Sequence, residues 1–424
     1  MKLLIINQPL NNRGDEAAHK AFVRTLLNII PEAYITVLFV QSYSPDAIRQ
    51  FRVKHDRVVY FDLHPQGNFW QLAEKWINEG NFSDWATSQD MQTMRNFYEA
   101  ADFVICAPGG ICMGAFQDWW HLFYLKFAQC LNKPLIYYGR SFGPFPTDTE
   151  QNVRFKEESL KILRYFSFIS IRDKKTEEIA AQIGNLHYFP TTDVAFLECP
   201  HVEVPKEVIN KIGAKPYMVF IPNYLLWHPM YKGKVEKEAI IDFYCEIIDA
   251  IEQQYPKHNI VMLPQTFGTG TYDGDDVFFF REIADIKDDK CLIVVPDIYS
   301  SDIQQSIIAS SQFVIGARYH SIVFALNQNV PFIALNYEHK IQGLLTALHK
   351  QECMVNIQNI FDCQQNIRMA LTKVKELLPV IGNDERAHQQ AYDEAWCCIR
   401  QLKSYLHFCS KDKGLMNKTQ FLQP

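Results

Sequence analysis

The sequence predicts an α/β protein with two Rossmann-like domains and a cleft between them. Short apolar runs rich in β-branched residues alternate with amphipathic helical patterns almost from the first residue. The alternation stops at a proline-bearing stretch, residues 199–216, and then begins again. Alternating strands and helices form a parallel sheet covered by helices on both faces. The stretch between the two series is interpreted as a linker, and clefts between domains commonly bind ligands.

The first series forms an amino-terminal domain, residues 1–204. Its expected strands are residues 2–7, 35–40, 58–63, 103–106, 134–138 and 168–171. Its expected helices are residues 16–30, 69–77, 91–100, 116–131 and 148–166. The strands are short and apolar throughout, as expected for strands buried on both faces.

The second series forms a carboxy-terminal domain, residues 205–380, which is followed by helices and a polar tail at residues 381–424. Its expected strands are residues 218–221, 260–263, 292–295 and 313–315. Its expected helices are residues 236–253, 277–285, 302–310 and 321–327.

Composition narrows the class of protein. Of the 424 residues, 48% are hydrophobic and 21% charged, which is typical of a globular chain. The formal net charge of -6 argues against nucleic acid as a partner. No apolar run is long enough to span a membrane, and the apolar amino terminus lacks a cleavage signature. The cysteines form no CxxC pair. We therefore expect a cytoplasmic protein with reduced thiols, without a metal or cofactor, and at most peripheral at a membrane.

The most informative stretch is residues 313–326. An apolar run ends at Gly316, and Arg318, Tyr319 and His320 follow before the next helical pattern. In open α/β sheets, ligands bind at the carboxyl ends of strands. Arg offers a fork of donors suited to carboxylate or phosphate, and His transfers protons near neutral pH. The alternative is a surface Arg and a packed core His on a connecting loop.

Two glycine-bearing loops follow strands of the first domain. Asn12 and Asp15 flank the first, where they either cap the following helix or present its amino terminus to an anion. Gly109 and Gly110 lie in the second and either allow backbone to approach a ligand or simply connect strand to helix. The second loop is not a P-loop, because Ala115 stands where that motif requires lysine.

Residues 139–143 spell GxSxG, the pattern of a nucleophile elbow. An elbow needs a helix directly behind the serine, and Pro144 and Pro146 prevent one. We therefore favour a turn that brings Arg140 and Ser141 to the cleft over a serine hydrolase.

A third cation, Arg172, ends another strand of the first domain. It either pairs with Asp173 at the surface or joins Arg318, one arginine from each domain, in binding a ligand that carries carboxylate and phosphate. In the second domain, Trp227 and His228 either line the cleft, where rings suit sugar stacking, or pack within a loop. The acidic loop at residues 273–276 superficially resembles a metal site, which we disfavour.

Taken in order, these segments resemble the polysaccharide pyruvyl transferase family. The resemblance rests on Asn-x-x-Gly-Asp at 11–15, Gly-Gly at 109–110, Gly-x-x-x-Gly-Pro at 139–144, Ser-Ile-Arg-Asp at 170–173, Thr-Asp-Val-Ala-Phe at 192–196, Arg-x-His at 318–320 and Tyr-Glu-x-Lys at 337–340. Each motif is weak alone, and seven in order are a fairly specific signal.

The resemblance implies a GT-B-like arrangement of the two domains and phosphoenolpyruvate as donor. The product would be a pyruvate ketal on a sugar of a cell-surface polysaccharide or its precursor, free or lipid-linked, with release of phosphate. Arg172 and Arg318 would bind the donor with Lys340, Gly109 and Gly110, and His320 would be the general acid. Asn12, Asp15, Arg140, Ser141, Asp193, Tyr319, Trp227 and His228 would lie near the cleft. The alternatives are a nucleotide-sugar glycosyltransferase of the same fold and a non-catalytic saccharide-binding relative.

Overall fold

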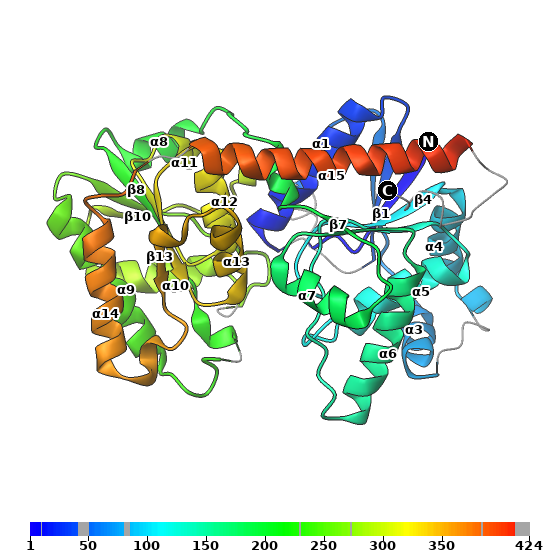
Figure 1. The fold of residues 1–424 in the computed structure, drawn as a ribbon. Helices are drawn as coiled ribbons and strands as arrows, with labels where there is room; N and C mark the ends of the chain where they lie inside the picture. Colours follow the sequence, from blue (N-terminus) through cyan, green and yellow to red (C-terminus); the bar gives the residue numbers. More distant parts are fainter. Residues whose placement is uncertain are drawn as a thin grey trace. The chain divides into compact units, whose positions relative to one another are not determined.

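The computed structural model describes residues 1–9, 11–40, 51–79, 85–228, 230–271, 274–382 and 385–411. It divides the chain into two compact units (Figure 1). The first unit holds residues 1–10, 18–197 and 393–424, and the second holds residues 11–17 and 198–392. A short segment near the amino terminus therefore belongs to the second unit, and the carboxyl terminus belongs to the first.

The first unit is built on a parallel sheet with strand order β3-β2-β1-β4-β5-β6-β7. The strands are β1 Lys2–Ile6, β2 Tyr34–Phe39, β3 Val58–Asp62, β4 Phe103–Cys106, β5 Leu135–Tyr137, β6 Phe168–Ile171 and β7 Phe189–Pro190. After β1 the chain adds β2 and β3 on one side and then places β4 on the other side. The carboxyl ends of β1 and β4 are therefore a topological switch point.

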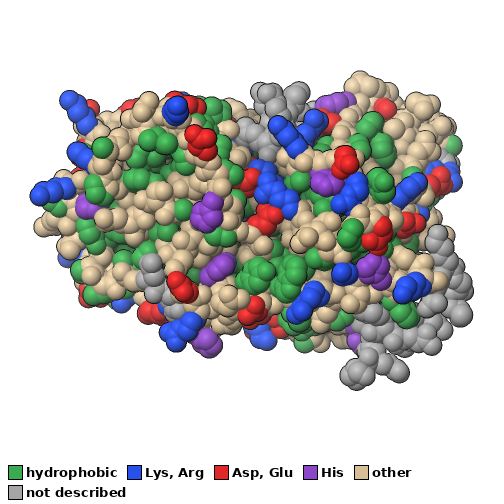
Figure 2. Space-filling model, turned by 90° about the horizontal axis from the view of Figure 1, so that it is seen from above, with side chains coloured by type: hydrophobic (Ala, Val, Ile, Leu, Met, Phe, Trp, Pro, Cys, Tyr) green, Lys and Arg blue, Asp and Glu red, His purple; other side chains and the backbone are tan. Residues whose placement is uncertain are grey.

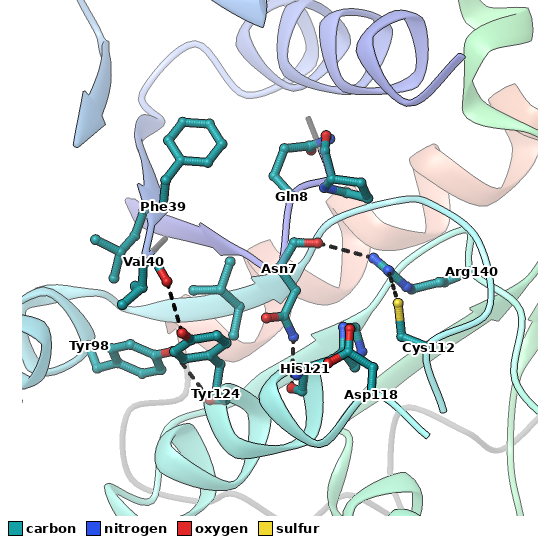
Figure 3. Close-up of a pocket in the computed structure, with 13 residues that line it drawn as sticks. Asn7, Gln8, Phe39, Val40, Tyr98, Cys112, Asp118, His121, Tyr124 and Arg140 are labelled. Atoms are coloured by element: carbon teal, nitrogen blue, oxygen red, sulfur yellow. Dashed lines mark hydrogen bonds between the residues drawn. The ribbon is translucent and has the colours of Figure 1, made fainter. Parts of the chain in front are cut away.

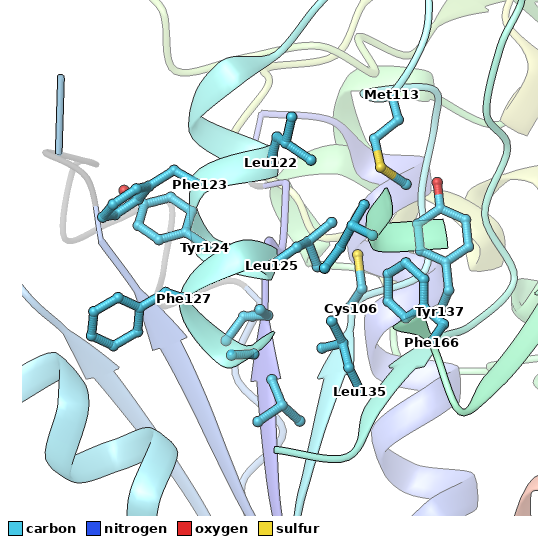
Figure 4. Packing of buried hydrophobic residues seen from close by; sticks show 14 of the residues in the cluster. Cys106, Met113, Leu122, Phe123, Tyr124, Leu125, Phe127, Leu135, Tyr137 and Phe166 are labelled. Carbon is cyan, nitrogen blue, oxygen red and sulfur yellow. The ribbon is translucent and has the colours of Figure 1, made fainter. Parts of the chain in front are cut away.

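Helices cover both faces of this sheet (Figure 1). They are α1 Arg13–Ile29, of which residues from Ala18 belong to this unit, α3 Phe69–Glu79, α4 Gln89–Ala100, α5 Trp119–Cys130, α6 Glu150–Tyr165, α7 Lys174–Ile183 and, from Asp393, α15 Glu385–Lys411. Apolar side chains of α5 pack on the strands, with Leu125 close to Cys106 (Figure 4). On the opposite face, Tyr405 of α15 packs on Phe103 with ring centroids 6.2 Å apart.

The second unit repeats the plan with strand order β10-β9-β8-β11-β12-β13, all parallel. Its strands are β8 Tyr217–Ile221, β9 Asn259–Met262, β10 Leu292–Val294, β11 Val314–Gly316, β12 Phe332–Asn336 and β13 Met354–Asn356. Its helices are α8 Lys206–Ile212, α9 Lys237–Gln254, α10 Asp276–Lys287, α11 Ser301–Ala309, α12 Tyr319–Asn327, α13 His339–Ala347 and α14 Gln364–Leu377.

Capping residues set where several helices begin. Ser88, Asp118, Thr149 and Asp173 each stand in front of a helix of the first unit and accept a hydrogen bond from an N–H of its first turn. Sequence patterns place α5 and α6 at residues 116–131 and 148–166, and these caps start them at Trp119 and Glu150.

The strands and helices named from the sequence are present. The patterns did not mark β7, β12, β13, α7, α13 and α14 as separate elements. β7 and β13 are short, with two and three residues, so they carry little periodic signal. The linker stretch at residues 199–216 contains α8, whose helical pattern spans only seven residues.

Charged side chains are mixed in sign on the face drawn in Figure 2, where Lys and Arg alternate with Asp and Glu among apolar atoms. Among the described residues, no helix is both long and apolar enough to cross a bilayer.

A buried histidine gives the first unit a predictable response to acid. His19 of α1 is fully buried, with Nδ1 2.9 Å from Gln8 Oε1 and Nε2 2.8 Å from the Tyr60 hydroxyl. Burial, with smaller contributions from Lys20 and Arg24, lowers the pKa of His19 from 6.5 to about 3. The folded protein therefore holds this imidazole neutral at pH values where the unfolded chain is protonated.

We predict that the free energy of unfolding falls as the pH drops below about 6.5, because the unfolded state then binds the additional proton. The contribution of His19 is about 1.4 kcal/mol per pH unit down to about pH 3. Urea unfolding of wild type and His19→Gln between pH 7 and 5 measures it, and the variant should show a shallower slope. His187→Gln, at an exposed position in the same unit, is the control. Equal slopes in wild type and His19→Gln would contradict the assignment.

Candidate functional site

Arg318 follows β11 and stands directly before α12, at the carboxyl edge of the second sheet. Its guanidinium forms an ion pair with Asp276, at the start of α10, and donates to Thr266 Oγ1 at 3.2 Å. The side chains of Arg318 and Asp276 are 12% and 1% exposed. Burial lowers the pKa of Arg318, and the carboxylate of Asp276 more than offsets this, so the pKa rises above its ordinary value. The site therefore holds a permanent positive charge in a fixed position.

Asp276 is fixed in turn by backbone. Its Oδ2 accepts hydrogen bonds from the N–H groups of Gln265 and Thr266, both at 2.9 Å. The neighbouring Asp275 accepts from Thr269 and Gly270 N–H groups, both at 2.9 Å. The described part of the acidic loop thus orders backbone and orients Arg318. Asp273 lies outside the described residues.

His320 lies in the first turn of α12 and is 8% exposed. Its imidazole packs against Gly14, because a Cβ placed on Gly14 would lie 1.8 Å from His320 Nδ1. Tyr319 contacts the same imidazole edge-on, with ring centroids 5.0 Å apart. Only glycine at position 14 permits this approach.

The segment that carries Gly14 contacts the rest of the second unit through Arg13 and Glu16, which also form a buried ion pair with each other. Arg13 Nη1 lies 2.5 Å from Glu16 Oε2, and both side chains are fully buried. The guanidinium stacks on Phe267, 3.7 Å from its centroid. Glu16 Oε1 accepts from the N–H and the hydroxyl of Ser301, both at 3.0 Å. Arg13 and Glu16 were not among the site residues predicted from the sequence, because nothing in the local pattern marks a charged residue as buried.

Asn12 and Asp15 flank this segment. Asn12 is the residue before α1, and its Oδ1 accepts from the N–H of Gly14 at 2.7 Å, which supports the capping interpretation. Asp15 lies in the first turn of α1.

Lys340, Trp227 and His228 gather around Tyr337 in the second unit. The Tyr337 ring lies 6.2 Å from Trp227 and 5.7 Å from His228, centroid to centroid. Lys340 Nζ lies 3.5 Å from the carboxylate of Glu338. Burial lowers the pKa of His228, and the charge of Glu338 opposes this. The arrangement holds aromatic rings and a lysine close together.

Arg172 and Asp193 form a buried ion pair in the first unit, with side chains 6% and 0% exposed. Asp173 caps α7 instead, accepting from the Thr176 N–H at 2.9 Å and from the Ser141 hydroxyl at 2.5 Å. Of the two interpretations of Arg172, pairing with its sequence neighbour is wrong, because Asp173 is committed to the helix cap.

The Ser141 hydroxyl donates to Asp173, the residue that caps α7. The next helix after Ser141, α6, begins only at Glu150. The geometry of a nucleophile elbow is therefore missing, as the prolines predicted.

Arg140 is 1% exposed, and its guanidinium donates to the Asn7 and Ala107 carbonyls at 3.2 and 2.8 Å. Gly109 packs against it, since a Cβ there would lie 3.2 Å from Arg140 Nη1, whereas Gly110 faces open space. In the structure, therefore, the eight predicted residues Asn12, Asp15, Trp227, His228, Arg318, Tyr319, His320 and Lys340 belong to the second unit. Gly109, Gly110, Arg140, Ser141, Arg172 and Asp193 belong to the first.

Comparison with known proteins identifies the family. The model of the polysaccharide pyruvyl transferase family matches residues 12–339. The chain belongs to this family. It is 24% identical over 389 residues to the amylovoran biosynthesis protein AmsJ of Erwinia amylovora, covering 85% of this chain and 89% of the relative. The family and this relative connect the chain with the biosynthesis of polysaccharides.

Solved structures establish the fold. A UDP-bound structure of S. aureus MnaA is similar with a TM-score of 0.56 at 12% identity, covering 96% of this chain and 97% of that one. The UDP-GlcNAc 2-epimerase of Methanocaldococcus jannaschii also gives 0.56, at 10% identity, covering 96% and 100%. The pyruvyl transferase family member described here thus has two parallel-sheet α/β domains of the GT-B-like type, as the sequence predicted.

We predict that Gly14→Ala destabilises the protein by about 1–3 kcal/mol, because the added methyl overlaps the His320 imidazole and forces it to move. Thermal melting measures the change. Gly343→Ala, in α13 of the same unit with open space around the added methyl, is the matched control and should not lower the melting temperature. Equal melting temperatures for the two variants would contradict the packing of Gly14 on His320.

Proposed function

We propose that the protein transfers the pyruvyl group of phosphoenolpyruvate to two hydroxyls of a saccharide, forming a ketal and releasing phosphate. Two findings support this reaction: the family match and the presence of a polysaccharide-biosynthesis relative. The observation that carries the chemistry is the placement of Arg318 and the buried His320 two residues apart, just after β11.

Arg318 suits the donor because the donor is an anion. Its guanidinium is held by Asp276 and Thr266, so it does not have to be ordered when substrate binds. An arginine fork matches the planar oxygens of a carboxylate or phosphate. Lys340, close to Tyr337 and Glu338, would add a second positive charge near the phosphate.

His320 would supply the proton that starts the reaction. The imidazolium gives its proton to the methylene carbon of the donor, converting it to a methyl group and leaving positive charge on the carbon that bears the phosphate. One acceptor hydroxyl adds to that carbon and returns a proton to the imidazole. The second hydroxyl displaces phosphate, which leaves with the remaining proton. Of the two hydroxyl protons, one ends in the methyl group and one on phosphate, so the step needs no further reactant.

Gly14 would position this acid. Because a side chain there would occupy the place of the imidazole, Gly14 and the ring of Tyr319 restrict where His320 can point. A general acid contributes about 10²–10⁴-fold to a rate only when it is held within hydrogen-bonding reach of its target.

Arg172, Asp193, Gly109 and Gly110 belong to the first unit, and we carry their predicted part in donor binding forward as a proposal. The buried ion pair with Asp193 fixes the position of the Arg172 guanidinium.

The test is phosphate release from phosphoenolpyruvate in the presence of a panel of saccharides. We predict release by wild type and a loss of about 10²–10⁴-fold in His320→Gln. The exposed His349, also in the second unit, provides the control His349→Gln, which should retain the wild-type rate.

Donor binding is measured separately by thermal shift. Phosphoenolpyruvate should raise the melting temperature of wild type and His320→Gln, because ligands stabilise the state that they bind. It should raise that of Arg318→Lys much less, since lysine cannot reproduce the bidentate contact. Stabilisation by nucleotide sugars and none by phosphoenolpyruvate would contradict the proposal and favour a glycosyltransferase.

A further inference from the structure

The first unit contains a cavity of about 140 Å³, and of its lining residues only Arg140 lies in a family motif (Figure 3). It lies against the residues that follow β1, Asn7, Gln8 and Pro9, and against Leu38 to Val40 at the end of β2. The loop after β4 and the start of α5 close it on the other side. This is the carboxyl edge at the β1–β4 switch point, the place where open α/β sheets bind ligands.

The polar lining comes from several elements that are tied together. Asp118 caps α5 through the His121 N–H at 2.9 Å, and Asn7 Nδ2 donates to the His121 carbonyl at 3.0 Å. Arg140 Nη2 lies 2.9 Å from Cys112 Sγ. These contacts place a carboxylate, an imidazole, an amide and a guanidinium around one space without their having to move on binding (Figure 3).

Aromatic residues form another part of the wall. Tyr124 donates to the Val40 carbonyl at 3.0 Å, and Tyr98 donates to the Tyr124 carbonyl at 3.2 Å. Phe39 lines the same space. A ligand that fits needs apolar faces for these rings and several hydroxyls that can both donate to the carboxylate and accept from the amide and guanidinium.

The charges of the lining exclude simpler ligands. Phosphate alone would meet Asp118, whose carboxylate repels it. A divalent cation would have ligand atoms available, since those of Cys112, Asp118 and His121 lie within 4.8 Å of one another. However, Arg140 sets a buried positive charge directly against the sulfur. An uncharged polyol can bond to both charged groups, because its hydroxyls donate to the carboxylate and accept from the guanidinium.

Size limits the ligand further. Pockets that enclose a drug-sized ligand measure about 300–1,000 Å³, so this cavity is too small for a nucleotide sugar. It suits a single ring. Arg140 is 1% exposed, and its Nε has no hydrogen-bond partner among the described residues.

We propose that this cavity binds one uncharged sugar ring, with Asp118, Asn7 and Arg140 bonding its hydroxyls. The further step, that this ring is the end of the acceptor saccharide, rests on the proposed function.

The experiment uses methyl glycosides of glucose, galactose, mannose and their 2-acetamido forms as probes. Cys112 is half-buried in the cavity wall, so an occupying ring should shield it from iodoacetamide. At a glycoside concentration ten times its Kd, alkylation of Cys112 should slow about tenfold, as occupancy requires. The exposed Cys130 of the same unit should react at an unchanged rate. Peptide mass spectrometry measures both in the full-length protein.

Asp118→Asn tests the contact, because asparagine caps a helix as well as aspartate does. Saturation-transfer NMR should show glycoside binding weakened about tenfold or more, since a hydrogen bond to a charged group is lost. Asp102→Asn is the control, because Asp102 accepts from the Lys2 N–H at 2.8 Å at the opposite edge of the sheet. It should bind as wild type does.

Protection of Cys112 by orthophosphate or Zn²⁺ alone, or by none of the glycosides, overturns the proposal. Failure of the cavity and failure of the proposed reaction are distinguishable. Phosphate release that depends on a saccharide and is unchanged in Asp118→Asn removes the cavity from the acceptor site. Glycoside binding without any reaction of phosphoenolpyruvate contradicts the reaction alone.

Discussion

The buried ion pair between Arg13 and Glu16 is the interaction on which the candidate site of the second unit depends. Both partners lie within residues 11–17, and the segment contacts the rest of the second unit where Arg13 stacks on Phe267 and Glu16 accepts from Ser301. These contacts set Gly14 against the imidazole of His320. Breaking a fully buried pair by removing one partner costs about 3–5 kcal/mol, because the other charge is left uncompensated. A buried ion pair contributes less to net stability than to holding its surroundings in one arrangement. Here that arrangement places Gly14 against His320, the proposed acid.

Two further arginines of the predicted site are also paired with buried carboxylates. Arg318 and Arg172 each follow a buried parallel strand, and each is held by a buried carboxylate, Asp276 and Asp193. Arg140 differs, because its described partners are carbonyls and a sulfur rather than a carboxylate. The two arginines proposed to bind the donor are thus each fixed by a carboxylate, whereas the arginine at the proposed sugar cavity is fixed by neutral groups.

Much of the fold was predictable because its signals are local. Short apolar strands and the turns behind them mark the carboxyl edges, and the motifs at residues 318–320 and 170–173 lie there. The ion-pair partners of the arginines were not predictable. Arg318 pairs with Asp276, 42 positions earlier, and Arg172 pairs with Asp193. The carboxylate next to Arg172, that of Asp173, caps α7 instead. The proposed sugar cavity combines residues of five separate segments, and of its lining residues only Arg140 lies in a motif named from the sequence.

Protonation of the donor carbon before the ketal forms can be detected by NMR of the product made in D₂O. With a saccharide that supports phosphate release, we expect one deuterium in the methyl group of a pyruvate ketal, delivered through the exchangeable proton of His320. A product that keeps the methylene as an enol ether, or that contains no donor carbon, would contradict it.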